Sequence, residues 1–138
     1  MKADLAGRSV LLLECDTFLA GYVGAALISA GARLVGPARD IVDARTIMSG
    51  VTGVDAAVIG ITQGTTDEWA FSEELEARGI VVILTSAASV EITKQPRETP
   101  HLKKAFAAYQ VVELVVEQLA LKLIDDERAK SVADDGYS

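Results

Sequence analysis

The sequence predicts an α/β domain built on a parallel sheet with helices on both faces, and three observations lead to this prediction. Short apolar runs alternate with segments whose apolar residues fall at helical spacing. The run Ile80-Val-Val-Ile-Leu-Thr85 is continuously apolar, as expected of a strand buried on both faces. The 138 residues are 50% hydrophobic, which suits a single domain with one core.

Charge and cysteine content exclude several classes of protein. The net charge of −7 argues against a nucleic acid or an anionic membrane as partner, because either would need a basic face. The longest uncharged run, Thr17 to Ala32, is too short to span a membrane and reads as a buried helix. One cysteine forms no internal disulfide, and no signal peptide is recognised, so we expect a reducing cytoplasm.

The elements follow one another at short intervals. We expect strands at residues 8–14, 32–38, 54–61, 80–85 and 101–103, and helices at residues 17–30, 41–48, 68–77 and 107–130. Asp40 is the expected N-cap of the second helix, and Thr66 or Asp67 that of the third. Residues 87–99 are poorly patterned, and Pro96 and Pro100 limit any helix there to a turn or two.

This order implies right-handed βαβ units and a flavodoxin-like, doubly wound five-stranded sheet. We assign residues 1–123 to the domain, and residues 124–138 to a helix extension with a disordered acidic tail. In such folds the functional cleft lies at the carboxyl ends of the strands. The strand ends are Glu14-Cys15-Asp16, Gly60-Ile61-Thr62, Thr85-Ser86 and Lys103-Lys104.

Those strand ends, in that order, resemble the receiver domain of two-component response regulators, a (βα)5 fold. LLLECDTFLA resembles the family's first strand and acidic turn, and ARLVGPARDIVDA its second strand and following helix. DAAVIGI resembles the phosphoacceptor strand, VVILTS the switch strand, and HLKKAF the Lys-Pro-Phe element. The resemblance covers residues 9 to 119.

The resemblance implies a site at which three acids bind Mg²⁺, one of them an aspartate that is phosphorylated. A hydroxyl and a lysine then hold the phosphoryl group. In this chain Cys15 and Asp16 stand at the acidic pair, Gly60 at the phosphoacceptor, and Thr62 at the metal-binding carbonyl. Thr85, Lys104 and Phe106 match the switch hydroxyl, the lysine and the aromatic residue, while Ala105 replaces the proline.

The match is therefore partial. Gly60 cannot be phosphorylated, and three carboxylates fall to one, so we expect weak or no Mg²⁺ binding and no other cofactor. We interpret the chain as a pseudo-receiver rather than an enzyme. Asp55 lies at the far end of its strand, and Asp67 and Glu68 lie at a helix start, so neither place offers a ready substitute phosphosite.

Each remaining site residue has a simpler interpretation. Lys104 pairs with Asp16 across the cleft, and Thr85 is an idle hydroxyl. Cys15 is either a small buried hydrophobic residue or, near a lysine, a redox-sensitive thiol. Cys15 and His101 supply too few ligands for zinc, so no metal site is expected.

The last helix carries two apolar groups. Val112, Val115, Val116, Leu119 and Leu123 form a stripe expected to pack on the sheet, and the displaced second group is Val111, Leu114, Leu121 and Ile124. The second group is either part of a wide core stripe or a partner or dimer face, and receivers commonly use this helix for dimers.

The expected function is that of a single-domain pseudo-response regulator that acts by phosphorylation-independent protein binding. Expected partners are a histidine kinase or phosphotransfer protein, or a second copy through the last helix. Two alternatives stay open: a residual phosphorelay receiver with an atypical phosphosite, and a redox sensor centred on Cys15.

Overall fold

The computed structural model describes residues 4–87, 99–103 and 105–135. Five parallel strands form one sheet in the order β2-β1-β3-β4-β5. The strands are β1 (Ser9–Leu13), β2 (Arg33–Ala38), β3 (Ala56–Ile61), β4 (Val81–Ser86) and β5 (His101–Lys103). The helices are α1 (Thr17–Ser29), α2 (Ile41–Ser49), α3 (Thr66–Ala77) and α4 (Ala108–Asp135). The predicted doubly wound parallel α/β fold is confirmed.

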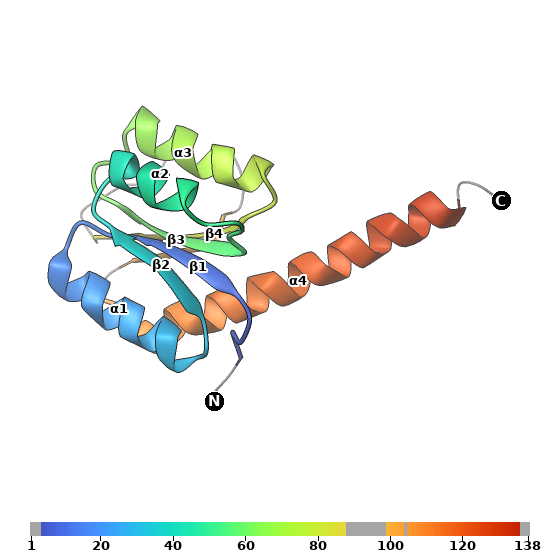
Figure 1. Cartoon of the computed structure of the whole chain (residues 1–138), viewed down its shortest axis with the longest axis horizontal. Helices are drawn as coiled ribbons and strands as arrows, with labels where there is room; N and C mark the ends of the chain where they lie inside the picture. Colours follow the sequence, from blue (N-terminus) through green and yellow to red (C-terminus); the bar gives the residue numbers. More distant parts are fainter. Residues whose placement is uncertain (1–3, 88–98, 104, 136–138) are drawn as a thin grey trace.

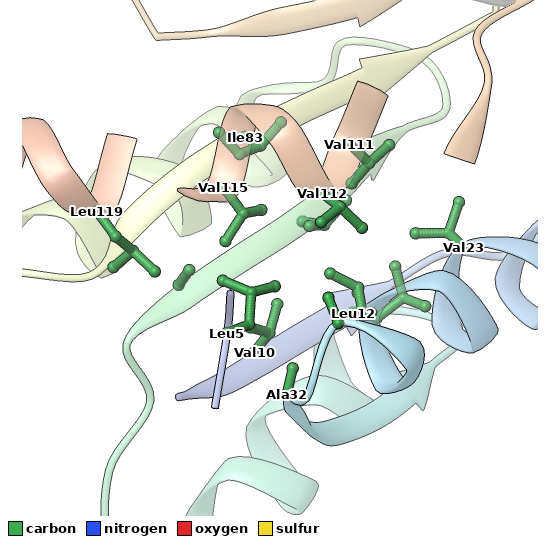
Figure 2. Close-up of a cluster of buried hydrophobic side chains, with 14 of the residues drawn as sticks. Leu5, Val10, Leu12, Val23, Ala32, Ile83, Val111, Val112, Val115 and Leu119 are labelled. Carbon is green, nitrogen blue, oxygen red and sulfur yellow. The ribbon is translucent and has the colours of Figure 1, made fainter. Parts of the chain in front are cut away.

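Two layers of helices enclose the sheet (Figure 1). Helices α1 and α4 cover one face, and α2 and α3 cover the other. Figure 2 shows the α1/α4 side, where Val111, Val112, Val115 and Leu119 of α4 meet Val10 and Leu12 of β1 and Leu5 from the turn before it. Both faces of β1, β3 and β4 are therefore buried, which explains their continuous apolar runs.

The strand register fixes what meets at the carboxyl ends. Leu13 pairs with Ile59 across β1 and β3, and Gly60 pairs with Thr85 across β3 and β4. Strand order reverses between β1 and β3, so the end of β1 and the end of β3 flank the place where ligands enter such sheets. On the other side of β1, the edge strand β2 carries an irregularity opposite Leu11 to Leu13, and Pro37 is tolerated at this edge.

Polar side chains begin three of the helices. Asp16 caps α1 by accepting from Leu19 N, and Asp40 caps α2 as predicted. The predicted cap of α3 is wrong: Thr65 caps it, one residue before the predicted Thr66. The Glu68 carboxylate accepts a hydrogen bond from the Thr65 N–H, and the Thr65 hydroxyl accepts one from the Glu68 N–H, so the two residues form a capping box.

Helix α1 differs from its prediction as a buried helix. Its inner side contributes Ala20, Val23 and Leu27 to the core, but the side chains of Phe18, Tyr22 and Ile28 are exposed. The prediction rested on the absence of charge between Thr17 and Ala32, and absence of charge does not show that every side of a helix is covered.

Helix α4 is longer than expected and projects past the end of the sheet (Figure 1). It runs to Asp135, so it includes residues 131–135 of the segment expected to be a disordered tail; residues 136–138 lie outside the described part of the chain. Within the described residues, no helix has both the length and the apolar character needed to cross a membrane.

Candidate functional site

A cavity of about 240 Å³ lies at the carboxyl ends of β1, β3 and β4. It adjoins most of the residues that the sequence placed at the site, namely Cys15, Asp16, Gly60, Thr62 and Thr85, together with Glu14 and Ser86. A second cavity of about 360 Å³ shares Cys15, Gly60 and Thr62 with it and extends toward the starts of α2 and α3. The parallel register therefore brings three separated segments of the sequence to one place.

Gly60 faces the carboxylate of Glu14. A Cβ atom at position 60 would lie 2.5 Å from Glu14 Oε1, 3.0 Å from Glu14 Cδ and 3.3 Å from the Leu13 carbonyl oxygen. Glu14 is 9% exposed, and its Oε2 accepts from Asp16 N at 3.1 Å. The space beside the end of β3 is thus occupied by a buried carboxylate from Glu14, the residue that follows β1.

This arrangement changes the assignment of the acids. Since Leu13 pairs with Ile59, the next residue, Glu14, lies beside Gly60. Asp16 lies two residues further along and uses its carboxylate to cap α1, with Leu19 N to Asp16 Oδ1 at 3.0 Å. Two carboxylates, not one, therefore adjoin the cavity. The sequence signal that could have found Glu14 is its place directly after an otherwise apolar strand.

Cys15 lies between these two acids and is exposed, which rules out its interpretation as a buried hydrophobic residue. Its side chain borders both cavities at the strand ends. The thiol is therefore accessible to small reagents from solvent.

Thr85 and Ser86 end β4 at the inner side of the cavity. Thr85 is 3% exposed and pairs with Gly60 in the sheet. Ser86 Oγ lies 2.7 Å from His101 Nε2, so a side-chain hydrogen bond joins β4 to the short strand β5. Burial, and then the charge of Lys103, lower the pKa of His101. Neutral histidine is thereby favoured at this contact.

The loop after β3 is held by one carboxylate. Glu68 accepts hydrogen bonds from Thr62 N at 2.8 Å, Thr62 Oγ1 at 2.8 Å, Gln63 N at 3.2 Å and Thr65 N at 3.0 Å. Burial opposes ionisation of Glu68, but these four bonds outweigh it and lower its pKa. The loop that borders Gly60 is therefore fastened to the first turn of α3.

The remaining predicted site residues divide into three groups. Lys104, with its predicted contact to Asp16, lies outside the described residues. Phe106 is half-buried and packs against the core on the α1/α4 side. On α4, Leu114 is half-buried against the same core, whereas Leu121 and Ile124 are exposed as a partner face would be.

Two assignments on α4 are corrected. Val111 was expected either in a wide core stripe or in a partner face; it is fully buried, so it belongs to the core and not to a partner face. Leu123 was placed in the core stripe, yet its side chain is 54% exposed. Leu123 follows Leu119 by one turn and borders an open hollow with Val54 and Gly79, so its side chain is only partly covered. Beyond this part, α4 projects past the end of the sheet (Figure 1).

The described residues contain no group of three or more histidine, cysteine, aspartate or glutamate side chains arranged to hold a metal ion. Asp55, at the opposite end of β3, accepts from Ser9 N at 2.8 Å and lies 3.6 Å from the Arg8 guanidinium. Asp55 therefore joins the amino ends of β1 and β3 and is remote from the cavity, as predicted.

Comparison with known proteins identifies the fold. No family model matches the sequence, and no curated protein is significantly similar to it. Among solved structures, a response regulator from Thermotoga maritima superposes with a TM-score of 0.68 at 15% identity, covering 82% of this chain and 98% of its own. The orphan response regulator HP1043 of H. pylori gives 0.63 at 16% identity, covering 86% and 99%.

A third similar structure is the response regulator PhyR from Brucella abortus, with a TM-score of 0.63 at 21% identity. It covers 99% of this chain but only 56% of the PhyR chain. The fold is therefore that of CheY-like response regulator receiver domains.

Proposed function

We propose that this chain is a pseudo-receiver: a domain with the receiver fold that regulates by binding a protein partner and is not itself phosphorylated. The observation that carries the proposal is the pairing of Gly60 with Glu14. Position 60 bears no nucleophile, and a buried carboxylate fills the space in which one would stand. An anionic phosphoryl group brought to this position would meet that carboxylate at close range.

The same geometry supports weak or absent Mg²⁺ binding. The ion favours several oxygen ligands in octahedral arrangement, and it gives up its water reluctantly. Here Cys15 supplies sulfur where an acid would serve, and Asp16 is engaged at the start of α1. The loop that would present the Thr62 carbonyl is fastened to α3 through Glu68. We therefore propose no resident cofactor and no enzymatic activity.

The proposed partner is a histidine kinase or a phosphotransfer protein, bound without phosphoryl transfer, and the compartment is the reducing cytoplasm. The receiver fold supports this class of partner, and the single cysteine supports the compartment. The exposed Leu121 and Ile124 of α4 support a contact surface there, for a partner or for a second copy.

Phosphorylation of three purified forms tests the proposal: wild type, Gly60→Asp, and Cys15→Asp/Gly60→Asp. Each is incubated with Mg²⁺ and acetyl phosphate, and the covalent adduct is measured by intact mass. We expect no adduct on the wild type and little on Gly60→Asp, because Cys15 still weakens the metal site. The double variant should form the most adduct. An ordinary rate for Gly60→Asp alone would show that Cys15 does not limit the site.

The accessible thiol supports a second candidate, oxidation sensing at Cys15. Peroxide treatment followed by mass analysis and by amide NMR would test it, with Cys15→Ser as the control. A sensor requires oxidation at low peroxide together with chemical shift changes that extend beyond the strand ends. Oxidation without such changes would leave Cys15 as an exposed thiol only.

A further inference from the structure

Helix α1 has an uncovered side that carries no charge. The segment Thr17–Ser29 contains no acidic or basic residue, although α1 lies at the surface. Phe18 is 81% exposed, and its ring stacks on that of Tyr22 with centroids 6.4 Å apart. Surface helices normally carry charged or polar side chains on the side that faces water. An uncharged outer side with aromatic residues is typical of a contact surface.

A groove of about 700 Å³ separates the second half of α1 from the first half of α4. Ala26 and Ala30 line it from α1, while Val112 and Val116 line it from α4. The small alanine side chains leave room that the two valines do not fill. Of these four residues, Ala30 and Val112 are buried, and the half-buried Ala26 and Val116 leave apolar surface open to water between the two helices.

The rim of the groove is acidic. Asp4, Glu113 and Glu117 border it with exposed side chains, and no lysine or arginine is among the described residues that line it. The whole chain carries a net charge of −7. A second copy placed here would bring the same carboxylates against these, which is unfavourable. Charge complementarity therefore favours a basic occupant.

A polypeptide bound in the groove must also find hydrogen-bond partners for its own backbone N–H and C=O groups. The groove is walled by two helices, whose backbone hydrogen bonds are internal, so an extended peptide would find no strand edge to pair with. A helix needs no such partner. Its apolar side can enter a groove of this kind with residues at i, i+3, i+4 and i+7.

We propose that the groove between α1 and α4 binds an amphipathic helix of a partner protein, with lysine or arginine residues flanking its apolar side and facing Glu113, Glu117 and Asp4. This inference rests on the proposed binding function, because it names the class of partner. The groove shares no lining residue with the cavity beside Gly60. Signals from the two places can therefore be measured separately.

The test is a titration of the ¹⁵N-labelled full chain with a synthetic helical peptide, followed by amide NMR. The probe has leucine at i, i+3, i+4 and i+7 and lysine at the flanking positions; the control peptide has glutamate in place of lysine. We expect saturable shifts at Ala26, Ser29 and Tyr109 with the lysine peptide only. Raising the salt from 50 to 300 mM should weaken its binding, since exposed charges are screened.

Matched charge reversals decide whether binding is specific. Glu113→Lys should lower the affinity for the lysine peptide by about tenfold, because a positive charge at the rim repels the peptide's lysines. Glu73→Lys makes the same change at an exposed glutamate of α3, on the other face of the sheet, and should leave affinity within about twofold. Phosphodonor adducts would refute the proposed function without bearing on these shifts.

Three results of the titrations would overturn the groove proposal: no saturable shifts along the groove at millimolar peptide, equal weakening by the two variants, or equal binding of the two peptides. A fourth is concentration-dependent self-association that shifts the same amides, because it would show a second copy as the occupant.

Discussion

The space beside Gly60 is filled by the carboxylate of Glu14, and this contact makes the glycine a packing requirement. Glu14 is buried and is held by the Asp16 N–H. Any side chain at position 60 must displace it. Gly60 and Glu14 therefore behave as a pair, and the effect of changing one depends on the other.

Gly60→Ala should lower the free energy of unfolding by about 1–2 kcal/mol, because its Cβ would lie 2.5 Å from Glu14 Oε1. In a Glu14→Ala background, the loss of unfolding free energy caused by Gly60→Ala should be smaller by about 1 kcal/mol, since the obstructing carboxylate is gone. Urea denaturation measures both. Gly53→Ala is the control, because its added Cβ meets nothing within 4 Å. Equal effects at positions 53 and 60 would contradict this account of the contact.

The lowered pKa of Glu68 predicts that the free energy of unfolding depends on pH. Its pKa is lowered in the folded chain, so it stabilises the fold above its unfolded pKa of about 4.3 and loses this contribution as the pH falls through the folded pKa. Glu68→Gln should cost about 1 kcal/mol at pH 7, the usual size of a lost cap. The difference between the two proteins should shrink below about pH 4.

Urea denaturation at several pH values measures this difference, with Glu73→Gln as the control, an exposed glutamate of the same helix. The loss of the His101 contact at acid pH affects both proteins equally and cancels in the comparison. A difference between wild type and Glu68→Gln that stays constant from pH 7 to pH 3 would contradict the assignment.

Among the elements, α4 changes its environment along its length. Val115 is fully buried in the core on the α1/α4 side (Figure 2), whereas the side chain of Leu123 is mostly exposed. Val115→Ala should lower the free energy of unfolding by about 1–3 kcal/mol, while Leu123→Ala should change it by less than about 0.5 kcal/mol. Thermal or urea unfolding gives both values. A large loss at Leu123 that depends on protein concentration would reveal a covering partner copy.

The elements also show where sequence reasoning succeeds and where it fails. Periodicity and turn residues located all five strands and all four described helices, because buried strands and capped helices leave strong local patterns. The environments of Val111 and Leu123 could not be predicted in this way. A pattern gives the side of a helix, but it does not give where the helix passes the end of the sheet.

The candidate site was predictable to within one residue. The carboxyl ends of the strands were correctly expected to meet, but the acid beside Gly60 is Glu14, which had been taken as the end of the strand. Strand ends are uncertain from sequence by a residue or two, and a shift of one residue moves a side chain to the other face. Only the pairing of Leu13 with Ile59 fixes the register.

At the scale of the whole molecule, two candidate surfaces lie in different parts of one fold. The strand ends hold a cavity beside Gly60, and the α1/α4 side holds an open acidic groove. A receiver switches when phosphorylation biases two conformations of the domain. In the proposed pseudo-receiver no phosphoryl group supplies this bias, so we propose that a bound partner supplies it.

The most direct measurement is amide NMR of the wild-type chain, titrated with Mg²⁺ and then with beryllofluoride or acetyl phosphate, with intact mass recorded in parallel. Fluorescence of Trp69, whose indole N–H donates to the Gly64 carbonyl at 3.1 Å, reports on the adjoining loop. We predict no saturable shifts at Asp16, Gly60 and Thr85 and no added mass. Saturable shifts there together with a covalent phosphoryl adduct would contradict the pseudo-receiver account.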